Sequence, residues 1–590
     1  VIVRISCGQR QGRHRRMTRM VLFVSVLLAS LGTACAPAIS PSGSQPPAPG
    51  GPAQPARILV AAVKAEPKTV SPRALGQNAG VSLILSKRIF NSDLAILDNQ
   101  SNPQPYLAEA LPQLGTDTWK VAPDGTMETI YRLKPNLTWH DGTPLTPDDF
   151  IFSWKVYSTK EFGSAGTQPF SIMQDVVAPD DRTVVIHWTR PYPTAGSLQS
   201  LGPGYVGMPT LPRSILGPAL ESGSVDAMLN HPYWSTGFVG LGPYKLDRWE
   251  PGAFLEGSAF ANHVLGAPKI ARIKLEFITD TNAVVASMLN GEVQLAGDSA
   301  LAVSQVPSLM GQFPEGAASV VWSAIQWRSA HFQNRPDFVS PKELQDLRVR
   351  KAIAHAVDRQ GINEVLYNGH YPLADTIFSP TSDLGRAAEA AVTKYPFDLR
   401  QSAQLIGEAG FIKGSDGYYT SPARARFSPQ VRVNAGTDNE AEMSALAAGW
   451  RQAGYDFQEF VLPAAQAQDV QSRSIFPGIY AIGTGIGDSI IDAMTSTNVP
   501  GPDNQWRGSA YDGYSSSEMD RLIAAYSTSL APADRIKGAV DIVKLYSNDL
   551  PAISLFFPAS PVVFSSVLTG PRLGPPEGNG YWDIYLWELR

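Results

Sequence analysis

The chain has 590 residues, of which 43% are hydrophobic and 17% are charged, and its formal net charge is −5. This length exceeds what one hydrophobic core normally supports, so two or three domains are expected. The ordinary apolar content excludes a disordered or fibrous chain. Glycine (51) and proline (48) are too frequent for a simple helical bundle, because both residues interrupt helices.

The amino-terminal segment is basic and then apolar. Six arginines and no acidic residue stand in residues 1–34, and the apolar run 21–31 is only about half as long as a membrane-spanning helix. This order is typical of a secretory signal peptide. The following residues, LGTAC at 31–35, resemble a bacterial lipobox. We therefore predict a signal peptide and lipobox at 1–35, with Cys35 lipidated; the alternative is that Cys35 is an incidental small residue.

Residues 36–56 read APAISPSGSQPPAPGGPAQPA and contain neither charged nor aromatic residues. Such a segment cannot bury enough apolar surface to fold, and its prolines make it a semi-extended spacer. We predict a tether here, which is compatible with a generic disordered terminus. Removal of the six arginines of 1–34 takes the net charge from −5 to −11. An acidic protein is poorly suited to nucleic acid or to an anionic membrane surface, so attachment to a membrane requires the lipid.

The folded body is expected to alternate strands and helices. Strands are recognised by apolar runs or by period-two alternation, and helices by a cap followed by a 3.6-residue apolar period. In chain order, the expected elements are a strand at 57–63, a strand ending at 130–133 after the Asp124-Gly125 turn, a helix opening at Pro147 with Thr146 as N-cap, strands at 183–188 and 272–277, and a helix-rich stretch at 347–367.

Motifs of catalysis are missing from the sequence. It contains no nucleophile elbow, HExxH, CxxC, Walker or dinucleotide fingerprint. The eight histidines have no metal-ligand spacing, and the only cysteines are Cys7 and Cys35. We therefore predict a protein without catalytic residues, metal or cofactor. Because Cys7 lies in the predicted signal peptide, the mature chain would retain only Cys35 and could form no internal disulfide. An enzyme is thus the first alternative considered for this chain. A purely structural surface lipoprotein is the second, and it would have neither a ligand nor a closing motion.

Residues 131–154, YRLKPNLTWHDGTPLTPDDFIFSW, closely resemble the segment that marks family 5 extracellular solute-binding proteins, the oligopeptide-, dipeptide- and nickel-binding group. By local physics this segment is structural, since Asp141-Gly142 makes a tight turn and Thr146-Pro147 starts a helix. Further stretches resemble the family in the same order: YLAEA at 106–110, LGPYKL at 241–246, SMLNGEV at 287–293, VRKAIAHAVDR at 349–359 and YSSSEMDRLI at 514–523.

The resemblance covers roughly residues 57–590 and implies an α/β clamshell of the type II periplasmic-binding kind with an extra lobe. Domain I would comprise 57–96, 242–325 and 559–590, domain II 97–241, and domain III 326–558. The ligand would lie between domains I and III. The two chain crossings near 322–326 and 555–560 would form the hinge.

In peptide-binding relatives an aspartate of domain III, placed after a short apolar strand, holds the ammonium group of the peptide. The matching stretch is IYAIGTGIGDS at 479–489, which makes Asp488 the implied contact. A carboxylate–ammonium contact is charge-assisted and stronger than a neutral hydrogen bond. The alternative is that Asp488 caps the next helix. The aromatic residue and the proline usual around this aspartate are absent, which also fits a broader or different pocket.

The remaining candidate ligand contacts are aromatic or glycine residues near the expected cleft: Trp322, Trp327, Trp506, Tyr244 and Gly242. Aromatic rings stack on ligands, but a buried tryptophan is also a common core residue. A glycine can present its backbone to a ligand or simply serve a turn. Both interpretations of these residues remain open.

The resemblance implies a monomeric solute-binding lipoprotein of an ABC importer, not an enzyme. It would be anchored at the outer face of the cytoplasmic membrane and would deliver solute to a permease whose ATPases lie on other chains. Peptide is the expected solute, because it is the commonest ligand class of such relatives. Oligosaccharides, glycosylated compounds and nickel or haem complexes are the alternatives.

Overall fold

The computed structural model describes residues 58–73, 75, 84–99, 102–200, 207–324, 326–379, 383–467, 469–504, 506, 508–572 and 580–590. All of them belong to one compact unit, Gln54–Arg590. The predicted signal peptide, Cys35 and the tether lie outside the described residues. Across the part that is described, every helix is either too short or too polar to span a bilayer.

A seven-stranded sheet gathers strands from distant parts of the chain, in the order β12-β20-β11-β1-β10-β9-β8. Its strands are β1 (Ile58–Val63), β8 (Tyr244–Glu250), β9 (Phe254–Ala259), β10 (Arg272–Phe277), β11 (Leu295–Ala296), β12 (Ala318–Ala324) and β20 (Ala559–Ser565). Side chains alternate between the two faces, so Ala61 joins one core cluster and Ala62 the other. The second cluster includes residues of α5 (Thr281–Leu289) and α6 (Val306–Gln312), and the first includes residues of α1 (Ile84–Phe90).

A four-stranded antiparallel sheet, in the order β4-β5-β7-β6, is formed within residues 119–188. Its elements and the neighbouring helices are β4 (Trp119–Val121), β5 (Met127–Arg132), β6 (Met173–Val177), β7 (Thr183–Trp188), α2 (Pro147–Tyr157), α3 (Arg213–Glu221) and α4 (Val225–Leu229). A small pair joins β2 (Ala95–Leu97) to β3 (Pro103–Pro105). The buried residues of this region share one continuous cluster with the seven-stranded sheet, so the two parts have a common core.

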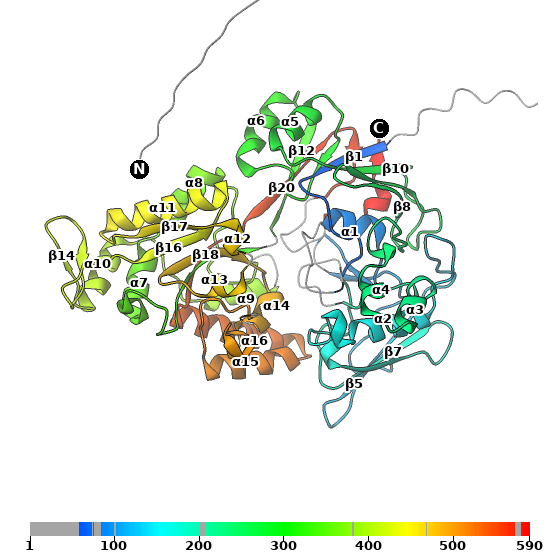
Figure 1. Cartoon of the computed structure of the whole chain (residues 1–590), viewed down its shortest axis with the longest axis horizontal. Coiled ribbons are helices and arrows are strands. Elements are labelled where there is room, and N and C mark those ends of the chain that lie inside the picture. Colours follow the sequence, from blue (N-terminus) through cyan, green and yellow to red (C-terminus); the bar gives the residue numbers. More distant parts are fainter. Residues whose placement is uncertain are drawn as a thin grey trace, which may run out of the picture. The chain divides into compact units, whose positions relative to one another are not determined.

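A five-stranded sheet has the order β17-β16-β18-β13-β19, and Figure 1 shows α11 running along it, in contact with β16 and β17. Its strands are β13 (Trp327–Phe332), β16 (Gln430–Asn434), β17 (Gln458–Leu462), β18 (Ile479–Thr484) and β19 (Ala552–Phe556). One core cluster contains residues of α7 (Leu347–His355), α8 (Arg359–Tyr367), α10 (Leu399–Glu408) and α11 (Thr437–Ala453). The other contains residues of α9 (Asp383–Ala391), α14 (Asp488–Ile491), α15 (Ser517–Thr528) and α16 (Pro532–Asp549).

Short elements complete the fold: α12 (Ala464–Ala467), α13 (Val470–Ser474), β14 (Ile412–Lys413) paired with β15 (Tyr419–Thr420), and β21 (Leu568–Thr569) paired with β22 (Glu588–Leu589).

The elements expected from the sequence are confirmed: β1, β5, β7 and β10 occupy the predicted strand positions, and α2 begins at Pro147. Thr146 is the N-cap of α2, and its backbone N–H donates to Asp149 Oδ2 at 3.0 Å. The predicted helix-rich stretch 347–367 consists of two helices, α7 and α8. It breaks at Asp358, whose carboxylate accepts the N–H of Gly361 and caps α8.

His140, in the family-like segment, joins that segment to the start of β8. Its Nδ1 accepts the N–H of Gly240 at 3.2 Å, so Nε2 carries the proton and donates to the Gly242 carbonyl at 2.9 Å. Gly142 supplies the positive φ of 87° that the preceding turn requires. Burial lowers the pKa of His140 from 6.5 to about 4, and burial has the same effect on His263. His140 is therefore a neutral structural clamp.

Because His140 is buried in its neutral form, we expect the stability of the folded protein to decrease in acid. Because the pKa of His140 lies lower in the folded than in the unfolded chain, its stabilising contribution is complete above about pH 6.5 and is lost as the pH falls toward about 4. The thermal midpoint should fall across this range. His140→Gln should lower the midpoint at pH 7 and flatten its dependence on pH. An equally steep pH dependence in the variant would contradict this assignment.

A buried ion pair lies under the start of β13. Arg328 Nε lies 2.7 Å from Glu442 Oε1 of α11, and the hydroxyl of Tyr367 donates to Glu442 Oε2 at 3.1 Å. The side chain of Glu442 is only 2% exposed. Burying both charges is costly, but removing one partner leaves the other charge uncompensated in the core.

Glu442→Ala should therefore lower the free energy of unfolding by about 3–5 kcal/mol, measured by urea denaturation. The matched control is Glu408→Ala, at an exposed position of α10, which should change stability by less than about 0.5 kcal/mol. Equal effects of the two substitutions would show that the buried pair has no special role.

Candidate functional site

A cavity of about 370 Å³ lies at the carboxyl end of β18. Its volume falls within the range of small-molecule sites, and in open α/β sheets ligands bind at the carboxyl ends of strands. The lining combines the strand end 482–485, the loop 509–512 and side chains of α14, α16 and β13. Its lining includes Arg473, Tyr480, Tyr511, Asp512, Tyr514 and Tyr546.

Aromatic rings and one arginine give this cavity its character. The guanidinium of Arg473 lies 5.1 Å from the centroid of the Tyr511 ring, a cation–π distance. The Tyr480 hydroxyl donates to Asn434 Oδ1 at 2.6 Å, and that of Tyr514 donates to Asp549 Oδ2 at 2.7 Å. Burial raises the pKa of Tyr480, so its hydroxyl remains protonated. The wall is therefore apolar and aromatic, with a cation beside it.

Asp512, the one carboxylate among the described lining residues, is already engaged. Its Oδ2 lies 2.9 Å from His331 Nδ1, and its Oδ1 accepts the backbone N–H of Tyr514 at 3.1 Å. His331 Nε2 in turn lies 2.8 Å from the hydroxyl of Ser329. This chain of hydrogen bonds fixes the loop 509–514 onto β13.

Asp488, the residue implied to hold an ammonium group, binds an arginine of its own chain. Its Oδ2 lies 2.6 Å from Arg535 Nη2, and the Tyr526 hydroxyl donates to its Oδ1. Arg535 also donates to that hydroxyl at 2.8 Å and lies 4.3 Å from the centroid of the Tyr526 ring. The helix-cap alternative does not hold, because the N-cap of α14 is Gly487 and Asp488 is the first helical residue. The contact with a solute stays a prediction.

A second carboxylate, Asp492, lies beside this cluster. Its Oδ1 accepts the Ser527 hydroxyl at 3.1 Å. Burial raises its pKa, while the positive charges of Arg190 and Arg535 act in the opposite direction. Arg190 follows β7 of the four-stranded sheet. The segment after β7 and the helices beside the five-stranded sheet therefore contribute to one group of charges.

Three of the other predicted ligand contacts, Trp327, Tyr244 and Gly242, are buried or closely packed against the protein itself. Trp327 is fully buried and packs edge-on against His331 and Tyr546, both of which line the cavity, so it supports the wall from behind. Tyr244 is also fully buried, in the common core of the first two sheets. An added Cβ on Gly242 would lie 2.4 Å from the backbone of Phe90, so close packing and not a turn explains this glycine.

The two remaining predicted contacts, Trp322 and Trp506, are only half-buried. Trp322 stacks on His370 with ring centroids 4.3 Å apart, and it packs against a core cluster of each of the two larger sheets. Trp506 has a φ of 62° and lies 6.3 Å from the Phe338 ring. The neighbouring Tyr511 and Tyr514 line the cavity instead.

Sequence reasoning missed Arg473, Arg535 and the Asp512–His331 pair. Arg473 lies in α13, a five-residue helix without a family-like motif, and Arg535 lies 47 residues beyond Asp488. Tyr511 and Tyr514 were not among the predicted contacts either, although they follow Trp506 in the sequence.

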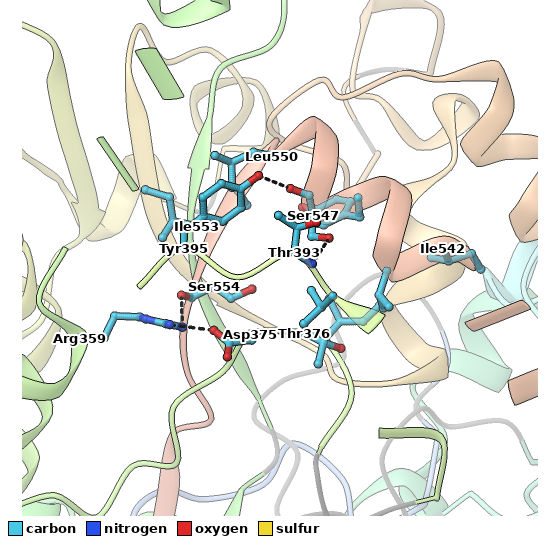
Figure 2. A pocket seen from close by; sticks show the side chains of 15 residues that line it. Arg359, Asp375, Thr376, Thr393, Tyr395, Ile542, Ser547, Leu550, Ile553 and Ser554 are labelled. Atoms are coloured by element: carbon cyan, nitrogen blue, oxygen red, sulfur yellow. Dashed lines mark hydrogen bonds and ion pairs between the residues drawn. The ribbon is translucent and has the colours of Figure 1, made fainter. Parts of the chain in front are cut away.

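Figure 2 shows a much smaller cavity, of about 30 Å³, between β19, α16 and the segment 375–395. Arg359 there pairs with Asp375 at 2.7 Å, and Tyr395 donates to the Ser547 carbonyl at 2.8 Å. This volume holds about one water molecule, so it cannot be the solute site. Within the described ranges, no group of three metal-ligating side chains gathers closely enough to hold an ion.

Known proteins with a similar sequence and fold belong to one family of bacterial binding proteins. The family model of bacterial extracellular solute-binding proteins, family 5, matches residues 109–499, which is more than half of the chain. The chain is 27% identical over 317 residues to a putative ABC transporter peptide-binding protein of Brucella ovis, covering 52% of this chain and 54% of that protein. The aligned part thus spans about half the length of the Brucella relatives.

An alignment along nearly the full length relates the chain to the oligopeptide-binding protein AppA of Bacillus subtilis, with 21% identity over 98% of this chain and 99% of AppA. Among solved structures, NikZ of Campylobacter jejuni in complex with Ni(L-His) superposes with a TM-score of 0.70 at 20% identity, covering 91% and 100% of the two chains. The oligopeptide-binding protein of Thermus thermophilus with a pentapeptide gives 0.68 at 21% identity, covering 90% and 96%.

These similarities confirm the predicted fold class, the α/β type II periplasmic-binding fold. The family consists of substrate-binding proteins of ABC transporters and not of enzymes. With its family model matched over residues 109–499 and its fold shared, this chain belongs to the bacterial extracellular solute-binding proteins, family 5.

Proposed function

We propose that this protein captures peptides outside the cytoplasm and delivers them to an ABC-type membrane permease. The observation that carries the proposal is the aromatic cavity of about 370 Å³ at the end of β18. It occurs in a chain that aligns over 98% of its length with an oligopeptide-binding protein. The protein itself has no catalytic role.

The cavity suits a peptide on physical grounds. Tyrosine rings provide contact area for side chains of many shapes, and their hydroxyls offer hydrogen bonds to peptide groups. The half-buried end of β18 at Gly483-Thr484, with Gly485 after it, lines the cavity with backbone as well as side-chain atoms. Extended peptides bind by adding to such strands, which gives affinity without strict sequence preference.

We further propose the three-part division predicted from the sequence, with domain I at 57–96, 242–325 and 559–590, domain II at 97–241 and domain III at 326–558. The grouping of strands supports it, because the three large sheets draw their strands from these same ranges. Solute would be enclosed by rotation of domain III against domain I, with Trp322 between their cores.

Anchoring and delivery complete the proposal. Lipid on Cys35 holds the protein at the outer face of the cytoplasmic membrane, and residues 36–56 let the folded unit reach solute. The protein acts as a monomer, and ATP hydrolysis occurs on other chains of the importer. A lipobox-like sequence and a proline-rich spacer support this arrangement.

A non-peptide solute is the alternative, whether an oligosaccharide, a glycosylated compound or a nickel or haem complex. It is favoured by the solved structures of similar fold, which include NikZ with Ni(L-His) and NikA of Brucella suis with Fe(III)-EDTA. The role in an importer would be the same.

Native mass spectrometry of the protein, purified without denaturant, tests the proposal. Solute-binding clefts often retain ligand, so we expect a distribution of added masses that fragment as peptides of several lengths. A single non-peptide mass would contradict the peptide assignment. Hydrolysis of the retained solute by the protein would contradict the binding role altogether.

A further inference from the structure

The negative charges around the cavity have partners within the chain, whereas the positive charge of Arg473 does not form an ion pair with a described residue. Asp488, next to the strand end that lines the cavity, has one carboxylate oxygen on Arg535 and the other on Tyr526. Arg535 is held by the long helix α16 and by the face of the Tyr526 ring, and its side chain is only 17% exposed. A solute ammonium would therefore have to displace a fixed guanidinium from this carboxylate.

The neighbouring carboxylates are engaged as well. Asp492 accepts the Ser527 hydroxyl and lies in the field of Arg190 and Arg535. Asp512 is hydrogen-bonded to His331 and to the loop backbone. Among the described residues, each carboxylate beside the cavity already has a partner. A solute cation that entered here would lose its water without gaining a compensating charge, which is costly.

Arg473 is in the opposite situation. Its guanidinium lines the cavity and rests on the Tyr511 ring. Among the residues that the structure describes, it forms no ion pair, and its buried Nε has no hydrogen-bond partner. A guanidinium binds carboxylates with paired hydrogen bonds, so this group offers a site for an anionic part of the solute.

We propose that this protein selects solutes that carry a carboxylate and lack a free ammonium group, such as peptides blocked at the amino end. Arg473 binds the carboxylate. The guanidinium of Arg535 occupies the carboxylate of Asp488, so this carboxylate does not attract the ammonium group of a solute. This inference rests on the proposed capture of peptides and specifies which peptides are captured.

Isothermal titration of the full-length protein with three forms of one pool of tri- to pentapeptides tests the selection. The forms are unmodified, N-acetylated, and amidated at the carboxyl end. The acetylated pool should bind more tightly than the unmodified pool, because its amino end carries no charge to desolvate. The amidated pool should bind about ten- to a hundred-fold more weakly, because one charge-assisted contact is lost.

Variants assign the effect to residues. Arg473→Gln should bind the acid and amide pools equally, whereas Arg400→Gln, at an exposed arginine of α10, should keep the wild-type discrimination. Arg535→Met should give Asp488 a free face and make the unmodified pool bind about tenfold more tightly than the acetylated pool. The comparison of the three pools on the wild-type protein needs no variant, so it stands even where a substitution impairs folding.

Tight binding of the amidated pool with loss of the acetylated pool would overturn this inference and leave peptide capture intact. Binding of none of the three pools would overturn peptide capture itself, and the inference with it.

Discussion

Two neighbouring strands leave the seven-stranded sheet and enter the five-stranded sheet, and the rest of the structure depends on these passages. β12 and β20 remain paired up to Ala324 and Ala559, and β13 and β19 are paired from Arg328 and Phe556. Ladder hydrogen bonds hold the backbone on both sides. The two crossings near 322–326 and 555–560 are therefore the hinge that we propose for a closing motion.

The first of these passages lies close in the sequence to the cavity at the end of β18. β13 begins at Trp327, directly after the first passage, and its His331 lies in the cavity wall. Trp327 packs behind that wall against His331. A change in the wall is thereby transmitted to the strand that crosses between the sheets, because tightly packed cores shift as units. In the function that we propose, this strand would link binding to closure.

Electrostatics gives the cavity a selectivity that its shape alone would not. The two carboxylates beside it, Asp488 and Asp492, are matched by arginines of the same chain, and Arg473 is the charge that remains for the solute. Asp488 shows how a position can keep the residue typical of the family while that residue binds a different partner, here Arg535. The specificity of relatives cannot be transferred to this protein without inspecting such partners.

Much of the fold could be predicted from the sequence because its signals are local. The proline at the start of α2, the cap at Thr146 and the alternation in β10 each depend on neighbouring residues only. The site could not be predicted in the same way. Whether Asp488 meets a solute or Arg535 depends on how α14 and α16 pack, and whether Trp327 faces a ligand or the core depends on long-range sheet order.

Small-angle X-ray scattering with and without bound solute tests the central claim, that this is a binding protein which closes around its ligand. The measurement uses the protein loaded with the peptides that it retains on purification, and the same protein after their removal. The account predicts a smaller radius of gyration in the loaded state. An identical radius in both states, with the cavity occupied in one of them, would contradict it.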